Sequence, residues 1–364
     1  MAEKVKIVHI INSFELGGAE KLVLNLCRLL PQEQFEIAIC SVIGSGPLIN
    51  DFEKLGIKVL VFKKKTKIGL AVIWQIYKFL KEYKPQIVHT HLFAADFWGK
   101  LAAILARVPV IITTEHSVNL EEGYLKKKVK LLLSYFTAQI IAVSEAVKDH
   151  YIQEVKIKAN KIKVIHNGVD LQRFAFRGYQ PIDLNNTIKA VVVARLEEVK
   201  GHRYLIAAMP QIIQKYPNFT LNVVGGGSLG KDLSEQAKQL KIEEKVIFWG
   251  MQFKPEEILP QMDLFILPSL WEGLGIVLLE AQAVGLPVLS SSIPGTKEVV
   301  IDGQTGLLFA IKSPEAISQC VERLLSNPDL AKKLVDNAHQ QVQAKFSLEK
   351  MAASYIDLYL SYNK

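Results

Sequence analysis

Residues 264–290 read LFILPSLWEGLGIVLLEAQAVGLPVLS. The stretch opens with four apolar residues, passes through a glycine-containing loop, and continues from Ile276 as an apolar run of helix length. A second short apolar run begins at Val288. Short, continuous apolar runs on either side of a helix-length segment are typical of parallel strands that are covered on both faces. The stretch therefore predicts a strand–helix–strand unit of an α/β domain.

The same alternation of short apolar runs and helix-length segments extends along the whole chain. A length of 364 residues is too great for one ordinary core, and the alternation restarts after a polar stretch at residues 170–186, which we interpret as a linker. We therefore expect two doubly wound, Rossmann-like α/β domains, residues 1–178 and 179–348, that face a central cleft. The expected strands are residues 6–11, 36–42, 58–62, 87–90, 110–114 and 139–143, then 189–193, 221–224, 246–249, 264–267, 288–290 and 306–309.

Bulk composition excludes several classes of protein. The three cysteines, Cys27, Cys40 and Cys320, are too few and too scattered for a disulfide framework or a zinc site. We therefore expect reduced thiols and a cytoplasmic location. The apolar stretch at residues 5–11 is short and interrupted by charge, which predicts no signal peptide. No apolar run approaches the roughly 18 residues of a membrane-spanning helix, so we expect none.

Charge is concentrated in the first half of the chain. Residues 1–180 hold 26 lysine and arginine residues against 16 acids, whereas the remainder is slightly acidic. Basic runs at residues 63–67 and 126–130 flank a mostly apolar, aromatic-bearing segment at residues 68–81. A basic face meets anionic lipid, nucleic acid or only solvent, and the aromatic residues beside the cations favour an anionic membrane surface. The candidate residues of this side are Lys126, Lys127 and Lys128.

Two carboxylates, Glu272 and Glu280, stand out in the opening stretch. Glu272 lies in the glycine-containing loop, and Glu280 lies inside the apolar helix. Eight helical residues rise by ~12 Å, which suits one extended ligand touched at two places better than one atom held by two acids. A carboxylate in an apolar helix is costly unless it meets hydrogen-bond donors, and the hydroxyl groups of a sugar or ribose provide them.

Loops that follow other expected strands carry groups suited to phosphates. Arg195 and Lys200 stand five residues apart after the first strand of the second domain, where arginine offers a forked contact and lysine a point charge. Glycines after strands let backbone amides approach an anion, with a helix N-terminus behind them. Together these loops predict a nucleotide-type ligand. The glycines and the neighbouring residue that we assign to donor binding are Gly17, Gly18, Gly225, Gly226, Gly273, Leu274 and Gly275.

Histidines end two expected strands of the first domain. His116 follows one strand and His91 ends another, so both are candidates for the wall of the cleft, with His91 on the acceptor side. His89 and His91 lie on one face of their strand because successive side chains alternate. We see no third ligand with open metal geometry and no Asp-x-Asp motif, so we expect no metal and no cofactor.

These motifs resemble those of the retaining GT-B glycosyltransferases of family 4, the glycosyl transferases group 1. The resemblance covers nearly the whole chain, and the Glu-x7-Glu pattern with the Arg/Lys pair is specific only in combination. The family resemblance implies a GT-B fold and a metal-independent transferase. The residues that carry it are Gly17, Gly18, Ala19, Glu20, His116, Arg195, Lys200, Gly201, Glu272, Gly273, Gly275 and Glu280, with residues 165–170 at the domain junction and residues 285–288 after Glu280.

The resemblance also implies roles for these residues. Arg195 and Lys200 hold the donor diphosphate and stabilise its departing charge. Glu280 binds the ribose hydroxyls and Glu272 binds the transferred sugar. In the first domain, Gly17 and Gly18 lie under the diphosphate or near the acceptor, and His116 contacts the donor sugar. The last helix, residues 349–364, packs back on the first domain.

The expected activity is therefore transfer of a hexose or N-acetylhexosamine from a nucleotide sugar, which we expect to be UDP-linked, to a saccharide or lipid-linked acceptor. The acceptor hydroxyl attacks the face that the diphosphate leaves, and the leaving phosphate oxygen serves as the base. Basic charge on the first domain favours glycan or exopolysaccharide assembly at the inner face of the plasma membrane.

Two other functions fit parts of the sequence. A non-hydrolysing nucleotide-sugar epimerase shares two similar domains but needs several acids in its cleft, where we find mainly Glu272 and Glu115. A non-enzymatic protein that binds nucleic acid through a basic surface would interleave aromatic residues with the lysine runs, and these are scarce. We expect no nucleic-acid partner.

Overall fold

The computed structural model describes residues 3–62, 70–117, 122–252 and 254–363. The chain forms two compact units: the first joins residues 1–167 to residues 348–364, and the second comprises residues 168–347. The basic run at residues 63–67 lies outside the described residues. Within those residues, no helix has both the length and the apolar character required to cross a membrane.

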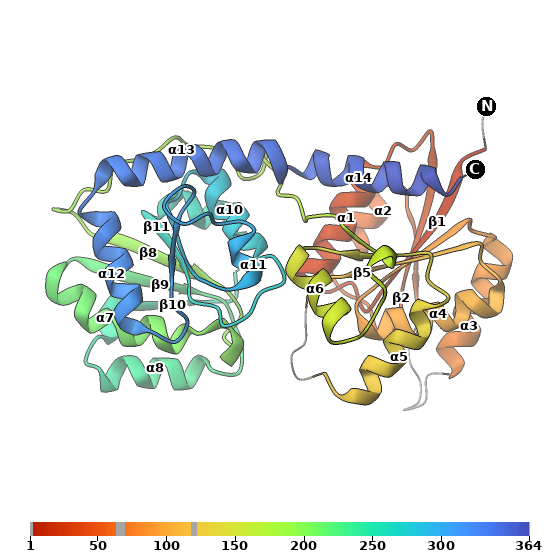
Figure 1. The fold of residues 1–364 in the computed structure, drawn as a ribbon, viewed down its shortest axis with the longest axis horizontal. Helices are drawn as coiled ribbons and strands as arrows, with labels where there is room; N and C mark the ends of the chain where they lie inside the picture. Colours follow the sequence, from red (N-terminus) through yellow and green to blue (C-terminus); the bar gives the residue numbers. More distant parts are fainter. Residues whose placement is uncertain (1–2, 63–69, 118–121, 253, 364) are drawn as a thin grey trace. The chain divides into compact units, whose positions relative to one another are not determined.

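The first unit is built on a parallel seven-stranded sheet with strand order β3-β2-β1-β4-β5-β6-β7 (Figure 1). Its strands are β1 (Val5–Ile11), β2 (Phe35–Ser41), β3 (Lys58–Val61), β4 (Ile87–His91), β5 (Val110–Glu115), β6 (Gln139–Ala142) and β7 (Ile162–Val164). Its helices are α1 (Gly18–Leu29), α2 (Ile49–Lys54), α3 (Leu70–Tyr83), α4 (Phe93–Ala106), α5 (Tyr124–Ser134), α6 (Glu145–Gln153) and α14 (Leu348–Ser361).

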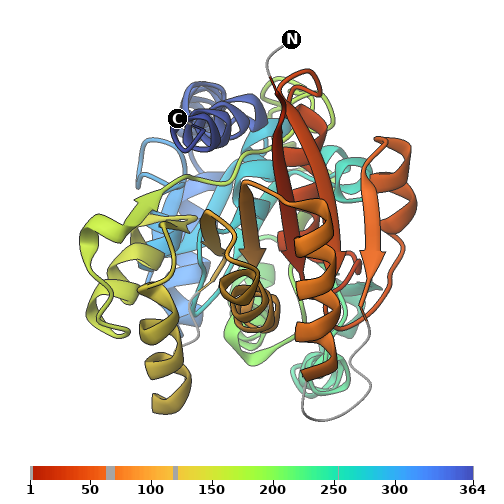
Figure 2. The same cartoon turned by 90° about the vertical axis from the view of Figure 1, so that its right-hand side faces the viewer.

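Helices cover both faces of this sheet, and the alternation along β1 shows why (Figure 2). Ile7 packs with residues of α1 and α14 on one face, whereas Val8 packs with residues of α3 and α4 on the other. Both side chains are fully buried. Successive strand residues point to opposite faces, so a strand buried on both sides is largely apolar, and a buried polar exception such as His9 needs hydrogen-bond partners.

The second unit has a parallel six-stranded sheet with strand order β10-β9-β8-β11-β12-β13. Its strands are β8 (Ile188–Val193), β9 (Phe219–Val224), β10 (Val246–Gly250), β11 (Leu264–Leu267), β12 (Val288–Ser291) and β13 (Leu307–Phe309). Its helices are α7 (His202–Lys215), α8 (Gly230–Gln239), α9 (Pro255–Ile258), α10 (Ile276–Val284), α11 (Pro294–Lys297), α12 (Pro314–Leu325) and α13 (Pro328–Lys345). In each sheet the strand order reverses beside the first strand, which is the doubly wound pattern.

The predicted fold class is confirmed: both units are α/β, with every expected strand present and its ends shifted by at most two residues. Three elements differ from expectation. Strand β7 and helix α11 were not expected. The sequence pattern of residues 255–262 predicts one continuous helix, but the structure has a short α9 followed by a 3-10 turn, Leu259–Gln261, because Pro260 has no amide hydrogen for helical bonding.

The stretch at residues 170–186 is not a free linker. The Val169 amide donates to the Phe346 carbonyl at 2.9 Å, the Phe174 ring is buried in the second unit's core, and Arg177 donates to the Met262 carbonyl at 2.6 Å. The stretch therefore packs along the second unit, and the two units divide after Asn167 rather than at the expected residue 178. The polar composition of residues 170–186 gave no indication of these anchoring contacts.

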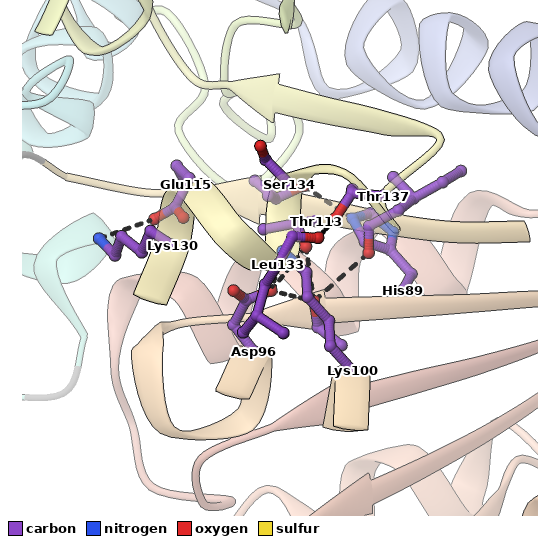
Figure 3. A network of polar contacts seen from close by, with 12 residues as sticks. His89, Asp96, Lys100, Thr113, Glu115, Lys130, Leu133, Ser134 and Thr137 are labelled. Atoms are coloured by element: carbon purple, nitrogen blue, oxygen red, sulfur yellow. Dashed lines mark hydrogen bonds and ion pairs between the residues drawn. The ribbon is translucent and has the colours of Figure 1, made fainter. Parts of the chain in front are cut away.

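The first unit buries an ion pair against its sheet (Figure 3). Lys100 Nζ lies 2.9 Å from Asp96 Oδ1, and both side chains are at most 4% exposed. The hydroxyls of Thr90 and Thr113 each donate to the same carboxylate oxygen at 2.6 Å. Because these strand hydroxyls and the ammonium satisfy it, the carboxylate is tolerated in the interior.

We predict that Lys100→Met lowers the free energy of unfolding by about 3–5 kcal/mol, because it leaves the Asp96 carboxylate buried without its counter-ion. The control is Lys54→Met, which removes an exposed ion pair to Asp51 at 3.6 Å and should cost less than about 1 kcal/mol. Urea unfolding followed by circular dichroism measures both. Equal losses in the two variants would contradict the buried-pair interpretation.

Candidate functional site

The carboxyl edge of the second sheet brings together most of the residues singled out in the sequence. Strands β9, β8 and β11 are neighbours, so the loops that follow them leave the same edge side by side. Arg195 and Lys200 follow β8, Gly225 and Gly226 follow β9, and Glu272 follows β11. Helices α7, α8 and α10 begin directly after these loops, which places three positive helix ends at the same edge.

Lys200 and Glu272 form the centre of this edge. Lys200 Nζ donates to Glu272 Oε1 at 2.6 Å, and the Ser269 hydroxyl donates to the same oxygen at 2.7 Å. The two charged side chains are 17% and 10% exposed, so the pair is largely shielded from solvent. Sequence reasoning expected both residues to bind the donor but did not anticipate that they pair with each other, nor that Ser269 joins them.

The loops approach each other so closely that only glycine fits at the contacts. A Cβ atom on Gly201 would stand 2.1 Å from the Pro268 carbonyl oxygen, and one on Gly225 would stand 1.9 Å from the Ala194 carbonyl oxygen. Gly201 and Gly225 also have positive φ angles of 65° and 149°. Gly295, which sequence reasoning missed, would bring a Cβ within 2.4 Å of the Glu272 carbonyl oxygen.

The remaining candidates of the second unit surround this pair. Arg195 is exposed at the end of β8, and Glu280 lies half-buried on α10. Gly273, Leu274 and Gly275 are buried before the start of α10, and Gly275 caps that helix with a φ of 78°. The Gly226 carbonyl accepts from the Leu196 amide at 2.9 Å, which ties the β8 and β9 loops together.

In the first unit, Gly17 and Gly18 begin α1, but their surroundings differ from those at the second sheet. Gly17 caps the helix, and a Cβ placed there would stand 2.1 Å from Glu20 Oε2. The Glu20 side chain is 7% exposed, and burial raises its pKa above the ordinary value. The Glu20 carboxylate therefore occupies the space that we expected the glycines to leave for a ligand.

Four histidines gather at the carboxyl end of the first sheet. His9 Nδ1 lies 3.1 Å from His91 Nε2, and His91 Nδ1 lies 3.2 Å from His116 Nε2. His89 bonds instead to the Tyr359 hydroxyl at 2.7 Å through Nδ1 and to the Thr114 hydroxyl at 2.8 Å through Nε2. His116 and His91 were expected here, whereas His9 was missed, because nothing local shows that β1 lies beside β4.

Burial keeps these histidines neutral. Desolvation lowers the pKa of His9 to about 3 and that of His116 to about 4. Burial and then the neighbouring histidines lower the pKa of His89 and His91 well below the ordinary value.

One nitrogen from each of His9, His89 and His91 lies within 4.8 Å of the others, which is the one group of metal-ligand type within the described residues. Both His89 nitrogens are already in hydrogen bonds, so a metal would have to displace the Tyr359 or Thr114 hydroxyl.

The basic run that the structure describes lies on α5. Lys126 and Lys128 are exposed, whereas Lys127 pairs with Glu154 at 2.8 Å. Exposed apolar side chains accompany these lysines on and just after the same helix. They are Tyr124, Leu125, Leu132, Tyr135 and Phe136, each more than half exposed.

Comparison with known proteins decides the family. Residues 180–341 match the family model described as Glycosyl transferases group 1, and residues 16–173 match that of Glycosyltransferase Family 4. The chain is 30% identical to UDP-Gal:alpha-D-GlcNAc-diphosphoundecaprenol alpha-1,3-galactosyltransferase of Escherichia coli, over 98% of this chain and 97% of that protein. The chain belongs to the glycosyl transferases group 1. The motif resemblance seen in the sequence is thereby confirmed.

Other relatives of this glycosyltransferase agree. It is 27% identical to the capsular polysaccharide biosynthesis glycosyltransferase CapM of Staphylococcus aureus, over 94% of this chain and 93% of that protein. Its fold matches Anabaena Alr3699/HepE solved with UDP, with a TM-score of 0.85 at 22% identity over 98% of this chain and 100% of that one. A glycosyltransferase from Rickettsia africae gives a TM-score of 0.85 at 24% identity over 100% of both chains. These matches confirm the GT-B fold.

We predict that the glycosyltransferase loses stability as the pH falls from 7 to 5. Its buried histidines have folded pKa values below the ordinary 6.5, so the unfolded chain binds more protons below that pH. Each such histidine should cost about 2 kcal/mol at pH 5. Burial raises the pKa of Glu115 and Glu20 above the ordinary value, so protonation of these carboxyls in the folded state opposes part of this loss as the pH falls toward that value.

Urea unfolding at both pH values measures the effect. His9→Asn should reduce the loss of stability between pH 7 and 5. Ile112→Val, a buried change beside His89 that removes no titrating group, should leave that loss unchanged. Stability that stays constant between pH 7 and 5 would show that the histidines are not held neutral by the fold.

Proposed function

We propose that this glycosyltransferase moves a hexose or N-acetylhexosamine from a UDP-sugar to a saccharide or lipid-linked acceptor, with retention of configuration and without a metal. The observation that carries the proposal is the Lys200–Glu272 pair at the edge where three loops and three helix N-termini meet. A cation beside a carboxylate there suits a ligand that carries both phosphate and sugar hydroxyls.

The donor diphosphate would bind next to the cationic side chains of Arg195 and Lys200. Arg195 is exposed at the end of β8, and Lys200 stands at the end of the following 3-10 turn. Lys200 Nζ is held by Glu272, so its ammonium would meet phosphate oxygens from a fixed position. The amides at the starts of α7, α8 and α10 add partial positive charge. These groups would stabilise the charge that develops on the departing diphosphate.

Glu272 and Glu280 would then bind the sugar and the ribose of the donor. Glu272 lies beside the fixed ammonium and would accept hydrogen bonds from the transferred sugar, with Gly273, Leu274 and Gly275 next to it. Glu280, in the second turn of α10, would accept hydrogen bonds from the ribose hydroxyls. His116 of the first unit is assigned to the sugar by family resemblance. No side chain is needed as a nucleophile if the leaving phosphate oxygen accepts the proton of the acceptor hydroxyl.

We predict that Arg195→Ala and Lys200→Ala each lower kcat by on the order of 10²-fold or more, since each removes charge that stabilises the leaving group. The control is Lys215→Ala at the opposite end of α7, where the lysine pairs with Glu322 on the surface. Steady-state kinetics with the best donor measures all three. Turnover close to that of the wild type in either test variant would show that the substituted residue does not stabilise the leaving diphosphate.

The donor, the stereochemistry and the reaction class are tested together. Nucleotide sugars are first ranked by the rise in melting temperature that each produces. The best donor is then incubated with and without a saccharide or lipid-linked acceptor, in the presence of EDTA, and the products are followed by NMR. We expect acceptor-dependent transfer with the anomeric configuration retained. Conversion of the donor sugar without acceptor would indicate an epimerase, an inverted product would exclude retention, and loss of activity with EDTA would exclude metal independence.

An anionic membrane surface is the proposed setting of the acceptor. The E. coli relative is named for a diphosphoundecaprenol-linked acceptor, and α5 of this chain presents Lys126 and Lys128 beside exposed Tyr124 and Leu125. Exposed aromatic and aliphatic groups among cations suit the boundary between lipid headgroups and acyl chains. A cytoplasmic enzyme attached to the inner face of the plasma membrane would meet such an acceptor there.

We predict that the protein sediments with vesicles containing phosphatidylglycerol but not with neutral vesicles, because each lysine near an anionic surface contributes about 1 kcal/mol. Replacing Lys126, Lys127 and Lys128 with glutamate should abolish sedimentation. The control replaces Lys332, Lys333 and Lys345 on α13 and should sediment like the wild type. Absence of sedimentation with both vesicle types would contradict the membrane proposal and leave the transfer reaction untouched.

A further inference from the structure

Three histidines form a hydrogen-bonded row across neighbouring strands of the first sheet. His9 lies on β1, His91 ends β4, and His116 follows β5 directly. The three strands are adjacent in the order β1-β4-β5. The contacts of 3.1 Å and 3.2 Å link His9 to His91 and His91 to His116, so His91 uses both ring nitrogens inside the row. We call these three residues the histidine row.

A row of neutral imidazoles has a direction. Each neutral ring carries one N–H donor and one bare nitrogen acceptor. His91 must therefore donate to one neighbour and accept from the other. Either His9 donates toward His116 along the row, or His116 donates toward His9. The first direction leaves the proton of His116 on Nδ1, and the second places it on Nε2.

The buried end of the row decides between these directions. His9 is fully buried, and its Nε2 has no hydrogen-bond partner among the described residues. If His116 donated along the row, His9 would accept at Nδ1 and its proton would sit on this unpartnered Nε2. Buried N–H groups without partners are rarer and more costly than bare acceptors. The direction in which His9 Nδ1 donates avoids that cost.

We propose that His9 and His91 are positioning residues that fix His116 in the tautomer with its proton on Nδ1. His116 Nε2 then accepts from His91, so Nδ1–H is the donor that His116 would offer to a ligand. His116 therefore acts as a hydrogen-bond donor to an oxygen and not as a base. The tautomer follows from the row alone, whereas the identity of that oxygen, on the transferred sugar, rests on the proposed function.

The sugar would gain a fixed orientation from this arrangement. A donor N–H whose tautomer is set before binding needs no reorganisation when a hydroxyl oxygen arrives. His89 lies beside the row but has a separate role, because its two nitrogens bond to Tyr359 and Thr114. Substitutions at Tyr359 thus disturb the same buried region without breaking the row.

The direct test is the protonation state of His116 in the whole protein. Two-bond 1H–15N correlation spectra of protein labelled with 15N-histidine distinguish the two neutral tautomers, and His116→Asn identifies its signals by their loss. We expect His116 as the Nδ1–H tautomer at neutral pH. An Nε2–H tautomer, or a stoichiometric metal that is bound by the wild type and lost from His91→Leu, would overturn the proposal.

Variants then connect the tautomer to catalysis. His91→Leu removes the donor to His116, so we expect mixed tautomers and a kcat lower by on the order of tenfold, with KM for the donor changing less. His91→Asn keeps an N–H near the position of Nδ1 and should restore most of the Nδ1–H tautomer of His116 and most of kcat. Tyr359→Phe, the control for disturbance of the core, should leave the His116 spectrum unchanged. An unchanged His116 spectrum in His91→Leu would also overturn the proposal.

Failure of the proposed function would look different. If no nucleotide sugar is turned over and His116 still carries its proton on Nδ1, the positioning role of His9 and His91 is supported and the proposed transfer reaction is contradicted. If transfer proceeds and His116 carries its proton on Nε2, the proposed transfer reaction is supported and the positioning role of His9 and His91 is contradicted.

Discussion

Backbone-to-backbone packing at the carboxyl edge of the second sheet is the constraint on which the proposed site depends. Gly225 faces the Ala194 carbonyl and Gly201 faces the Pro268 carbonyl at distances that no side chain could tolerate. The β8, β9 and β11 loops are therefore fixed against each other by their main chains. This close packing supports the loops that carry the Lys200–Glu272 pair, and such support is the preorganisation that electrostatic stabilisation requires.

The first unit buries many polar side chains beneath its helices, and these side chains require hydrogen-bond partners. Asp96 is satisfied by Lys100 and by strand hydroxyls on the α4 face of the sheet. On the opposite face, Tyr355 and Tyr359 of α14 bond to Thr114 and His89. The last helix thus completes hydrogen bonds that begin some 270 residues earlier in the chain. Its return to the first unit follows from chemical complementarity as well as from apolar packing.

Periodicity of the sequence was sufficient to predict the fold and which loops of the second unit leave the same edge of the sheet. Short apolar runs are read locally, so all expected strands appeared, and the loops that follow parallel strands must share one edge. What could not be predicted depends on contacts between distant residues. His9 joins His91 across 82 residues, and Lys200 meets Glu272 across 72. Likewise, residues 170–186 looked like a linker because Phe174 and Arg177 gain their partners only in the folded unit.

Hydrogen–deuterium exchange with and without UDP tests the central claim, that the carboxyl edge of the second sheet binds the donor nucleotide. Bound ligand slows exchange of amides that it contacts or whose opening it suppresses. We predict slowed exchange in residues 194–201, 225–230 and 268–280, with α12 unchanged. Exchange slowed only in the first unit, or nowhere at saturating UDP, would contradict the assignment of this edge as the nucleotide site.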